Sequence, residues 1–550
     1  MMKSKTMKLQ IAFTLLLTFS SISAFASEPN EESFLGCLLK ESHDNTISSI
    51  IYTPQNSNFS SVLDFYIQNS RYLNPETPKP KIILTPTTES HIQTAIYCGK
   101  KHNLQMRVRS GGHDFAGSSY ISEVPFFILD MFNFRSISID VESRTAWVEA
   151  GATLGELYYS IYEKSSSLSF PAGYCPTVGI GGHISGGGYG GLTREYGLAA
   201  DNVIDARVMD VNGAILDRAS MGEDLFWAIR GAIGSNFAVI LSYKITLVEV
   251  PENVTSFFVS RTLEQNAIQL VHKWQYVAPK LPKGLTISLM LSSGISTRTG
   301  EKTVIATFIA VYRGGVDELL SIMESNFPEL GLTKEDCKEM LWIQYFPFHL
   351  GQSIDNIKEF LTSRVSPNKP YFTGKVDFVK DPISEKGLEK ILSNLLEVDP
   401  FLGIMEWTIF GGGVMDTIPE SETPFPHRGN LMIMFEVAFW TPNDSSSVIQ
   451  TRIDWLRKLH KDIGDYVPNN PRGAYIDYRD LDLGVNNVVG ETSIEQARKW
   501  GAAYFKDNFD RLVKVKTQVD PDNYFKNEQS FPTLFPYSTK IGDTECFSSS

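Results

Sequence analysis

The first 250 residues alternate between short apolar strands and amphipathic helices. Apolar residues recur at the 3.6-residue spacing of a helix over 31–40, 60–68, 89–102 and 153–162. Alternating or fully apolar segments predict strands at 81–86, 105–109, 126–130, 136–140, 145–149 and 203–211. Several strands follow one another without an intervening helix, which predicts an α+β fold with helices beside a strand-rich lobe.

Longer elements follow from about residue 254. Amphipathic helices are predicted at 264–277 and 317–324, and apolar strands at 285–291, 303–312 and 431–439. This alternation predicts an antiparallel sheet covered by helices on one face. No internal repeat or low-complexity linker divides the chain.

Composition limits the class of protein. A chain of 550 residues is too long for one small core, and its 42% hydrophobic and 12% aromatic residues can fill a large one. Its net charge of −13, without a run of Lys or Arg, argues against nucleic acid or an anionic membrane as a partner. A neutral or cationic small molecule is the expected partner. A monomer is expected, although the sequence leaves the oligomeric state open, because it contains no coiled-coil or apolar repeat that would indicate an assembly.

The N-terminus has the parts of a secretory signal peptide. Lys3, Lys5 and Lys8 precede an apolar stretch at 9–19, and small residues follow at 24–26. We expect residues 1–26 to be removed in the secretory pathway. The apolar stretch is too short to span a bilayer, so no integral membrane association is expected. Glycosylation is predicted at three Asn-X-Ser/Thr sites, Asn58, Asn253 and Asn443.

Five cysteines stand in this oxidising setting, namely Cys37, Cys98, Cys175, Cys337 and Cys546. An odd number leaves at least one outside any intramolecular disulfide. Cys175 lies between Tyr174 and a glycine-rich loop, a position that favours a cofactor bond over a buried structural thiol. The sequence indicates no role for Cys337 or Cys546.

The segment Arg109–His113 directly follows a predicted strand and reads RSGGH. Main-chain amides can approach an anion where no Cβ blocks them, so Ser110, Gly111 and Gly112 form a candidate pyrophosphate nest. Arg109 would fix this loop or add charge. Alone, the two glycines would indicate a surface turn, and His113 would be interpreted as a structural histidine. The prediction of a cofactor site here therefore depends on a second motif.

The second motif is Gly173–Gly191, which holds Cys175 and a glycine-dense run. A dinucleotide-binding fold would need a preceding strand, a helix that opens at the third glycine and an acid about 20 residues later. Here the glycines continue too long for a helix, and the next acid is Glu195. The dinucleotide-binding hypothesis is therefore rejected.

Together the two motifs resemble those of the plant berberine bridge enzyme-like (reticuline oxidase-like) family of FAD-linked oxidases, within the vanillyl-alcohol oxidase and p-cresol methylhydroxylase fold group. The resemblance extends from about residue 32 to 532 and includes Pro521–Phe525 and Gln529-Ser530. It implies a two-lobed FAD-binding domain, 27–250 and 493–550, around a substrate domain, 251–492, whose antiparallel sheet is covered by helices. It also implies the apoplast or the vacuole as the destination.

The resemblance implies bicovalent FAD, bonded from His113 to the flavin 8α-methyl group and from Cys175 to flavin carbon 6. Val178 matches an oxygen gatekeeper position, where slim residues admit O2 and bulkier Leu or Ile exclude it, so an oxidase that releases H2O2 is predicted. The family also pairs Cys37 with Cys98, and no metal is expected. Further cofactor contacts are expected from Arg109, Ser110, Gly111, Gly112, Val178, Gly181, Gly182, Gly187 and Asn523.

Hydride loss from a C–H next to O or N needs a base for the accompanying proton. Tyr189, Tyr475 and Tyr478 stand at active-site positions of the family, and Tyr478 corresponds to the proposed base of the cannabinoid-forming branch. Because the pKa of tyrosine is about 10 in water, such a base needs help from a neighbour. Asp477 replaces the usual Asn, and we favour a structural role for it. An ion-paired turn is expected from Arg479, Asp480 and Asp482.

The predicted strand at 431–439 departs from the family. Carbohydrate and monolignol oxidases have Lys and Gln, and the berberine-forming branch a catalytic Glu, where this chain has Ile433 and Phe435. Glu436 is adjacent, but a shift of one residue on a strand points it to the opposite face, so we do not expect a glutamate base here. The apolar replacements favour an aromatic or prenylated substrate over a sugar.

The expected function is a secreted FAD-dependent oxidase of a hydrophobic specialised metabolite, such as a phenolic, terpenoid-phenol or alkaloid. Oxidative cyclisation after hydride removal is one expected outcome. Two alternatives stay open: an oligosaccharide oxidase, and a flavoprotein that catalyses a non-redox cyclisation such as a Diels-Alder reaction.

Overall fold

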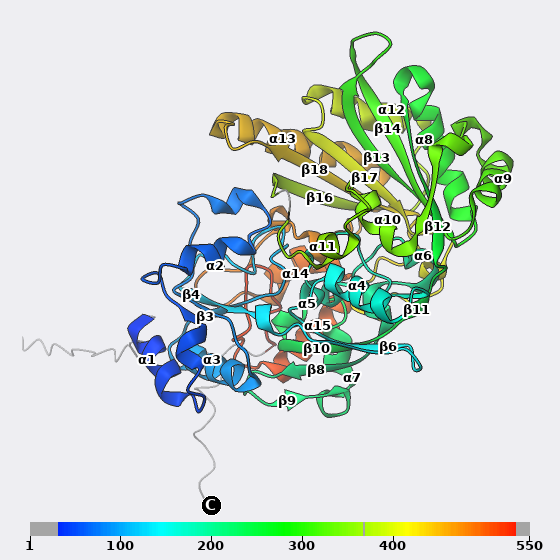
Figure 1. Cartoon of the computed structure of the whole chain (residues 1–550). Coiled ribbons are helices and arrows are strands. Elements are labelled where there is room, and N and C mark those ends of the chain that lie inside the picture. The colour runs from blue at the N-terminus through cyan, green and yellow to red at the C-terminus, as the bar shows by residue number, and fades with distance from the viewer. Residues whose placement is uncertain (1–30, 367–368, 535–550) are drawn as a thin grey trace, which may run out of the picture.

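The computed structural model describes residues 31–366 and 369–534. The predicted signal peptide and Cys546 lie outside these residues. Figure 1 shows two lobes: the N-terminal part of the chain and the C-terminal helices form one, and a large sheet with its own helices forms the other. None of the helices in the described part of the chain combines the length and hydropathy of a membrane span.

The first lobe begins with a sheet in which β4 (Phe126–Asp130) runs parallel to both β2 (Ile82–Leu84) and β3 (Gln105–Arg109). A short antiparallel strand, β1 (Ile51–Tyr52), completes it next to β2. Helices α1 (Glu31–Glu41) and α3 (Glu89–Lys101) cover one face, and α2 (Phe59–Phe65) covers the other. A disulfide between Cys37 and Cys98 joins α1 to α3, which confirms the predicted pair.

A second sheet of the same lobe is antiparallel, with the strand order β5-β6-β10-β8-β9. Its strands are β5 (Ile137–Asp140), β6 (Thr145–Glu149), β8 (Val203–Met209), β9 (Ile215–Leu216) and β10 (Val239–Thr246). A two-stranded ladder pairs β7 (Leu168–Ser169) with β11 (Val248–Glu249). The helices in this part are α4 (Leu154–Lys164), α5 (Ile180–Gly186), α6 (Thr193–Tyr196) and α7 (Arg218–Ala228).

The C-terminal part of the chain returns to the first lobe. Helices α14 (Ile494–Phe505) and α15 (Asn508–Val519) bury their apolar side chains in the same core as β6, β8 and β10, and Figure 1 shows them beneath the second lobe. Segments far apart in sequence thus share one core, as a discontinuous domain requires. The exact boundaries at 250 and 492 stay a prediction.

The second lobe is built on a seven-stranded antiparallel sheet with the order β15-β12-β14-β13-β17-β18-β16. The strands are β12 (Asn253–Thr262), β13 (Leu285–Ile295), β14 (Lys302–Tyr312), β15 (Cys337–Leu341), β16 (Tyr371–Val379), β17 (Gly403–Ile409) and β18 (Met432–Trp440). Four helices bury side chains in the core on one face, α8 (Ala267–Val277), α9 (Val316–Asn326), α12 (Glu385–Ser393) and α13 (Ser446–Ile463). The predicted antiparallel sheet with helices on one face is confirmed (Figure 1).

Helix ends differ from the predictions where the backbone changes direction. The helix predicted at 264–277 is divided, because Asn266 takes a positive φ of 63° between a 3₁₀ turn and α8. The helix predicted at 317–324 extends over α9 (Val316–Asn326). Two further helices, α10 (Trp342–His349) and α11 (Ile357–Thr362), lie between β15 and β16 in sequence, and α11 contacts α4 of the first lobe.

The glycine run contradicts one prediction. Residues Ile180–Gly186 form the helix α5, although five of the glycines expected to prevent a helix lie in or next to it. Ile180 and Ile184 are fully buried in the core of the first lobe. Their burial outweighs the low helix propensity of glycine, which costs about 1 kcal/mol per residue relative to Ala.

Candidate active site

A deep cavity lies between the two lobes and is lined by both glycine motifs. The first motif begins where β3 ends. Arg109 is fully buried, pairs with Asp130 at 2.6 Å and donates to the carbonyl oxygens of Val62 and Leu63. Arg109 therefore anchors the start of the loop and does not line the cavity.

The glycines of the first motif are required by close approach of the backbone. A Cβ at Gly111 would lie 2.3 Å from the backbone nitrogen of Gly179, so the two motifs pack directly against each other. Gly112 has a φ of +70°, and a Cβ there would lie 1.7 Å from the carbonyl oxygen of Tyr66. Both glycines line the cavity together with Ser110.

The second motif supplies the opposite part of this wall. Gly181, Gly182 and Val178 line the cavity, and a Cβ at Gly182 would meet no atom within 4 Å. The backbone at Gly182 therefore borders the cavity directly. Two of the residues predicted to contact the cofactor do not line this cavity. Gly187 lies outside the lining, and Asn523 lines a separate groove.

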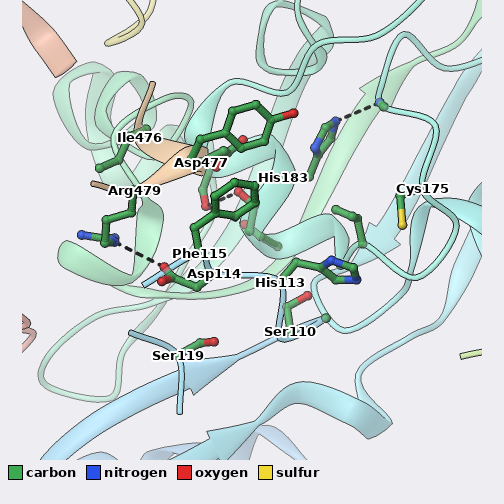
Figure 2. Close-up of a pocket in the computed structure, with 18 of the residues that line it drawn as sticks. Ser110, His113, Asp114, Phe115, Ser119, Cys175, His183, Ile476, Asp477 and Arg479 are labelled. Carbon is green, nitrogen blue, oxygen red and sulfur yellow. Dashed lines mark hydrogen bonds and ion pairs between the residues drawn. The ribbon is translucent and has the colours of Figure 1, made fainter. Parts of the chain in front are cut away.

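His113 and Cys175 extend into this cavity from the two motifs (Figure 2). His113 Nε2 lies 2.9 Å from the hydroxyl oxygen of Thr177, which lies 3.5 Å from Cys175 Sγ. Burial lowers the pKa of His113 to about 4, so its imidazole is neutral at physiological pH. Cys175 forms no disulfide within the described residues. A neutral imidazole and a free thiol are thus both available to form bonds.

The three predicted tyrosines meet in one aromatic group. The hydroxyl groups of Tyr189 and Tyr478 lie 3.0 Å apart, and the Tyr475 hydroxyl donates to Asp477 at 2.7 Å. The ring of Tyr478 also stacks on Phe115, with centroids 4.7 Å apart. Burial raises the pKa of Tyr189, Tyr475 and Tyr478 well above the usual value, so all three are protonated at neutral pH.

Asp477 lines the cavity rather than only capping a turn. Burial raises its pKa to about 8, and the hydrogen bond from Tyr475 opposes this shift. A Cβ at Gly186 would lie 1.8 Å from Asp477 Oδ1, so the carboxyl packs tightly against α5. The Tyr475 hydroxyl also accepts the backbone N–H of Gly188 at 2.8 Å, which ties Tyr475 to the glycine motif.

The expected ion-paired turn is different in the structure. Arg479 pairs at 3.3 Å with Asp114, the residue after the first motif, and both side chains line the cavity (Figure 2). Asp480 and Asp482 both pair with Lys375 of β16, at 2.6 and 3.0 Å. Asp482 also pairs with Arg457 of α13 at 2.8 Å. The charged residues of this turn therefore pair with three other segments and not with one another.

Strand β18 presents different chemistry on its two faces. Ile433 and Phe435 join the apolar cluster around Tyr189, Tyr475 and Tyr478. Glu436 lies on the opposite face, fully buried and 3.5 Å from His460 Nδ1. The predicted orientation of Glu436 is therefore the one observed.

Asp377, Glu436 and His460 lie close enough together to hold a metal ion. Arg472, however, donates to both carboxylate oxygens of Asp377 at 2.6 Å. This guanidinium already supplies the positive charge that a metal would bring, so we interpret the group as a buried ionic cluster.

Sequence reasoning missed Glu406, which lines the cavity from β17 together with Thr408. Alternation along Gly403–Ile409 was the available signal. Met405, Trp407 and Ile409 point into the core under the helices, so the residues between them face the other way. Glu406 and Thr408 are the two polar residues of this strand, and their alternation with the core residues indicates which face borders the cavity.

Comparisons with known proteins agree with an FAD site at this cavity. A sequence profile described as an FAD binding domain matches residues 80–218, and one described as berberine and berberine like matches residues 474–532. These segments contribute the first glycine motif, Cys175, the second motif and the Tyr475–Arg479 segment of the wall. The cavity's glycine-lined backbone fits this cofactor, and the fold and site define an FAD-dependent oxidoreductase.

The chain belongs to the berberine bridge enzyme-like family. It is 48% identical over 533 residues to berberine bridge enzyme-like 8 of Arabidopsis thaliana, which covers 96% of this chain and 100% of that protein. It is 46% identical to tetrahydroberberine oxidase of Argemone mexicana, covering 96% of this chain and 97% of the relative. The solved structure of BBE-like #28 from Arabidopsis thaliana has 45% identity and a TM-score of 0.85, over 92% of this chain and 100% of that one.

Proposed function

We propose that this protein is a secreted oxidase that removes a hydride from a small hydrophobic metabolite and passes the electrons to O2, giving H2O2. The substrate is a phenolic, a terpenoid-phenol or an alkaloid, and oxidative cyclisation can follow. The observation that carries the proposal is that His113 and Cys175 line one cavity with Tyr189 and Tyr478. The hydroxyl of the buried Thr177 lies next to both His113 and Cys175.

In this proposal His113 and Cys175 hold the FAD covalently, and the FAD supplies the hydride acceptor. The backbone at Gly182 can approach the cofactor closely, because no side chain fills the open space beside it. Gly111, Gly112 and Gly181 instead allow the two loops to pack against neighbouring backbone. The rings of Phe115 and Phe435 pack against the ring of Tyr478, with centroid distances of 4.7 and 4.8 Å, and hold it in place.

Tyr478 takes the substrate proton in this account, and Tyr189 orients its hydroxyl at 3.0 Å. Because burial raises the pKa of Tyr478, its hydroxyl carries its own proton at neutral pH. Tyr478 therefore takes the substrate proton only as the phenolate, after its own proton has passed to solvent, and the raised pKa makes that phenolate a strong base. Tyr475 is held by Asp477 and Gly188, and it supports the wall without taking part in the proton transfer.

Val178 lines the cavity, where its slim side chain would leave a path for O2. One solved relative with 43% identity supports this interpretation. The wild-type grass pollen protein Phl p 4.0202 is described as a glucose dehydrogenase, and an isoleucine-to-valine variant of Phl p 4 as a glucose oxidase.

The same relatives make a sugar the second candidate substrate. Ile433 and Phe435 weigh against it, because a sugar pocket needs polar side chains that replace the hydrogen bonds of water. A non-redox cyclisation is the third candidate, and it would consume no O2.

Oxygen consumption and H2O2 release test these alternatives directly. The secreted, flavin-loaded protein is supplied in parallel with phenolics, terpenoid-phenols, alkaloids and mono- and oligosaccharides. We expect peroxide in a 1:1 ratio to product with a hydrophobic substrate and none with sugars. Turnover with a sugar would select the second candidate, and product without peroxide would contradict the oxidase.

Entry into the secretory pathway is part of the proposal, with the apoplast or the vacuole as the destination. The side chains of Asn58, Asn253 and Asn443 are exposed, so all three predicted sites are accessible for glycosylation. We propose that the protein works as a monomer, which sedimentation of the mature protein tests.

A further inference from the structure

The carboxyl group of Asp477 lies against the second glycine motif and lines the cavity together with His113 and Cys175 (Figure 2). Its Oδ2 accepts the hydroxyl of Tyr475 at 2.7 Å. Its Oδ1 packs so closely against Gly186 of α5 that a Cβ there would lie 1.8 Å away. The side chain is only partly buried, and no step of the proposed reaction uses it.

The hydrogen bonds of Tyr475 fix the direction of its contact with Asp477. The Tyr475 oxygen accepts the backbone N–H of Gly188 at 2.8 Å. If Asp477 also donated to this oxygen, the hydroxyl proton of the buried Tyr475 would have no acceptor among residues 31–366 and 369–534, which is costly. Tyr475 therefore donates to Oδ2, and any proton that Asp477 carries lies on Oδ1.

Asp477 carries such a proton at neutral pH. Burial raises its pKa to about 8, and the hydrogen bond from Tyr475 opposes this shift. The charge of Asp114 raises the pKa further, whereas that of Arg479 lowers it. The cavity is also lined by three charged side chains that are not among the causes of this shift: Arg107, Glu406 and Lys526.

The titratable groups that pack around Asp477 from other segments supply no positive charge at neutral pH. Burial raises the pKa of Tyr478 and of Tyr243 on β10, so both are protonated and neutral. Burial lowers the pKa of His183 on α5 to about 4, so its imidazole is neutral as well. Strand β16 also packs against this segment, and its charged residues are paired elsewhere: Lys375 with Asp480, and Asp377 with Arg472.

We propose that Asp477 is a cofactor-binding residue that acts as a neutral carboxyl group and donates a hydrogen bond from Oδ1 to the flavin ring. A protonated carboxyl group offers one acceptor and one donor, as the side-chain amide of Asn does. Tyr475 uses the acceptor, so the donor remains. The cofactor is the expected partner, because Gly186 and Gly188 beside this carboxyl belong to the segment that matches the FAD binding domain.

Loss of the proton changes the sign of this contact. The donor becomes an anion beside the ring, and it then disfavours the addition of electrons to the flavin. The usual Asn would keep its donor at any pH, so the dependence on pH is specific to an Asp at this position. This inference rests on the proposed function only for the presence of FAD in the cavity, and it needs neither the covalent bonds nor O2.

Two measurements on the flavin-loaded protein test the role of Asp477 without turnover, from about pH 6 to 10. Infrared spectra follow the band of a protonated carboxyl group, and the equilibrium between oxidised and reduced flavin is measured against a reference dye without O2. The proteins compared are wild type, Asp477→Asn, Tyr475→Phe and the control Asp381→Asn, whose side chain is exposed on the second lobe. The difference between wild type and Asp477→Asn isolates the Asp477 band from those of Glu406 and Glu436, whose pKa values are also raised.

We expect wild type and Asp381→Asn to show the Asp477 band at low pH and to lose it around pH 8. Their flavin should be as easily reduced as that of Asp477→Asn at the acidic end, and at least about tenfold harder to reduce at the alkaline end. In Tyr475→Phe the transition should move to higher pH, because the lost hydrogen bond stabilises the charged carboxylate.

A wild-type flavin equilibrium that stays parallel to that of Asp477→Asn over the whole range would overturn the role of Asp477. Absence of the Asp477 band at the acidic end, or a transition that moves to lower pH in Tyr475→Phe, would also overturn it. Should Asp477→Asn fail to fold, wild type and Tyr475→Phe still give the direction of the shift.

These outcomes are distinguishable from failure of the proposed function. Covalent flavin and peroxide release, together with parallel flavin equilibria in wild type and Asp477→Asn, would overturn only the role of Asp477. Flavin that is released by acid, or product without peroxide, would contradict the proposed function and leave the role of Asp477 intact.

Discussion

The hydroxyl of Thr177 lies 2.9 Å from Nε2 of His113. The same oxygen lies 3.5 Å from the sulfur of Cys175, so one side chain contacts both residues of the proposed covalent attachment. Thr177 is almost completely buried, which leaves its hydroxyl few other partners. A hydrogen bond to one imidazole nitrogen fixes which nitrogen carries the proton and leaves the other free to react.

Thr177→Val should therefore slow covalent attachment of FAD, because the imidazole and the thiol lose their common partner. We expect a mixture of one-bond and two-bond flavin in the variant, measured by intact mass and by proteolysis of the purified protein. Thr177→Ser restores the hydroxyl and should restore complete attachment. Complete two-bond attachment in Thr177→Val would show that this contact is not needed.

Tyr478→Phe should reduce kcat more than Tyr189→Phe does. Removing a positioned proton acceptor typically costs about 100-fold or more, whereas removing its hydrogen-bond partner costs less. Because burial raises the pKa of Tyr478, kcat/KM of the wild type should rise as the pH increases above neutrality. Steady-state kinetics over pH 6–10 check both points. A loss of kcat of about the same size in the two variants would contradict the prediction.

Val178→Leu should separate the two halves of the reaction. The larger side chain would narrow the path to the flavin from the cavity wall. We expect flavin reduction by substrate at the wild-type rate, and reoxidation by O2 slowed at least about tenfold, which corresponds to about 1.4 kcal/mol in activation free energy. Stopped-flow absorbance measures both rates, and unchanged reoxidation would remove Val178 as the gatekeeper.

The buried cluster of Asp377, Glu436, His460 and Arg472 should control stability. Asp377→Ala leaves Arg472 and His460 without their closest carboxylate, and we expect a loss of about 3–5 kcal/mol in the free energy of unfolding. Asp454→Ala is the matched control on α13, because its pair with Arg457 is exposed and worth about 1 kcal/mol or less. Denaturant titration of the flavin-loaded proteins measures both values, and equal losses would contradict the prediction.

The same cluster predicts a direction for the pH dependence of stability. Burial raises the pKa of Glu436 from 4.5 to about 7, so its contribution falls as the pH rises through that interval. Burial opposes protonation of His460, but Asp377 raises its pKa from 6.5 to about 9, so its contribution is complete below pH 6.5 and is lost as the pH rises through 9. The unfolding temperature should therefore decrease from pH 7 to 9, and less so in Glu436→Gln/His460→Gln. Below pH 7 the four histidines that burial keeps neutral, His113, His183, His349 and His427, change the stability in the opposite direction. An increase over this interval in the wild type would contradict the assignment.

Local pattern was sufficient for much of the fold. Strands β3 and β4 have the predicted ends, because Gln105–Arg109 and Phe126–Asp130 are continuous apolar or alternating runs bounded by turn residues. The prediction that 180–186 would not form a helix was wrong. The glycines argue against a helix locally, but the burial of Ile180 and Ile184, which stabilises α5, is a tertiary effect. Helix propensity takes no account of contacts with residues that are distant in the sequence.

The candidate site divides in the same way. His113 and Cys175 could be found because their glycine neighbours form recognisable motifs. Glu406 could not, because its importance arises from the pairing of β17 with β18, a contact between strands whose register the sequence leaves open. Arg479 was assigned to its own turn, although its partner Asp114 lies 365 positions away in the chain.

The central claim is tested most directly by the mass and colour of the secreted protein after acid denaturation. We predict that the yellow colour stays with the polypeptide and that its mass includes one FAD. His113→Ala should lose part of this attachment, and His113→Ala/Cys175→Ala should lose it completely. Colour that leaves with the supernatant from the wild-type protein, or a protein without flavin, would contradict the account.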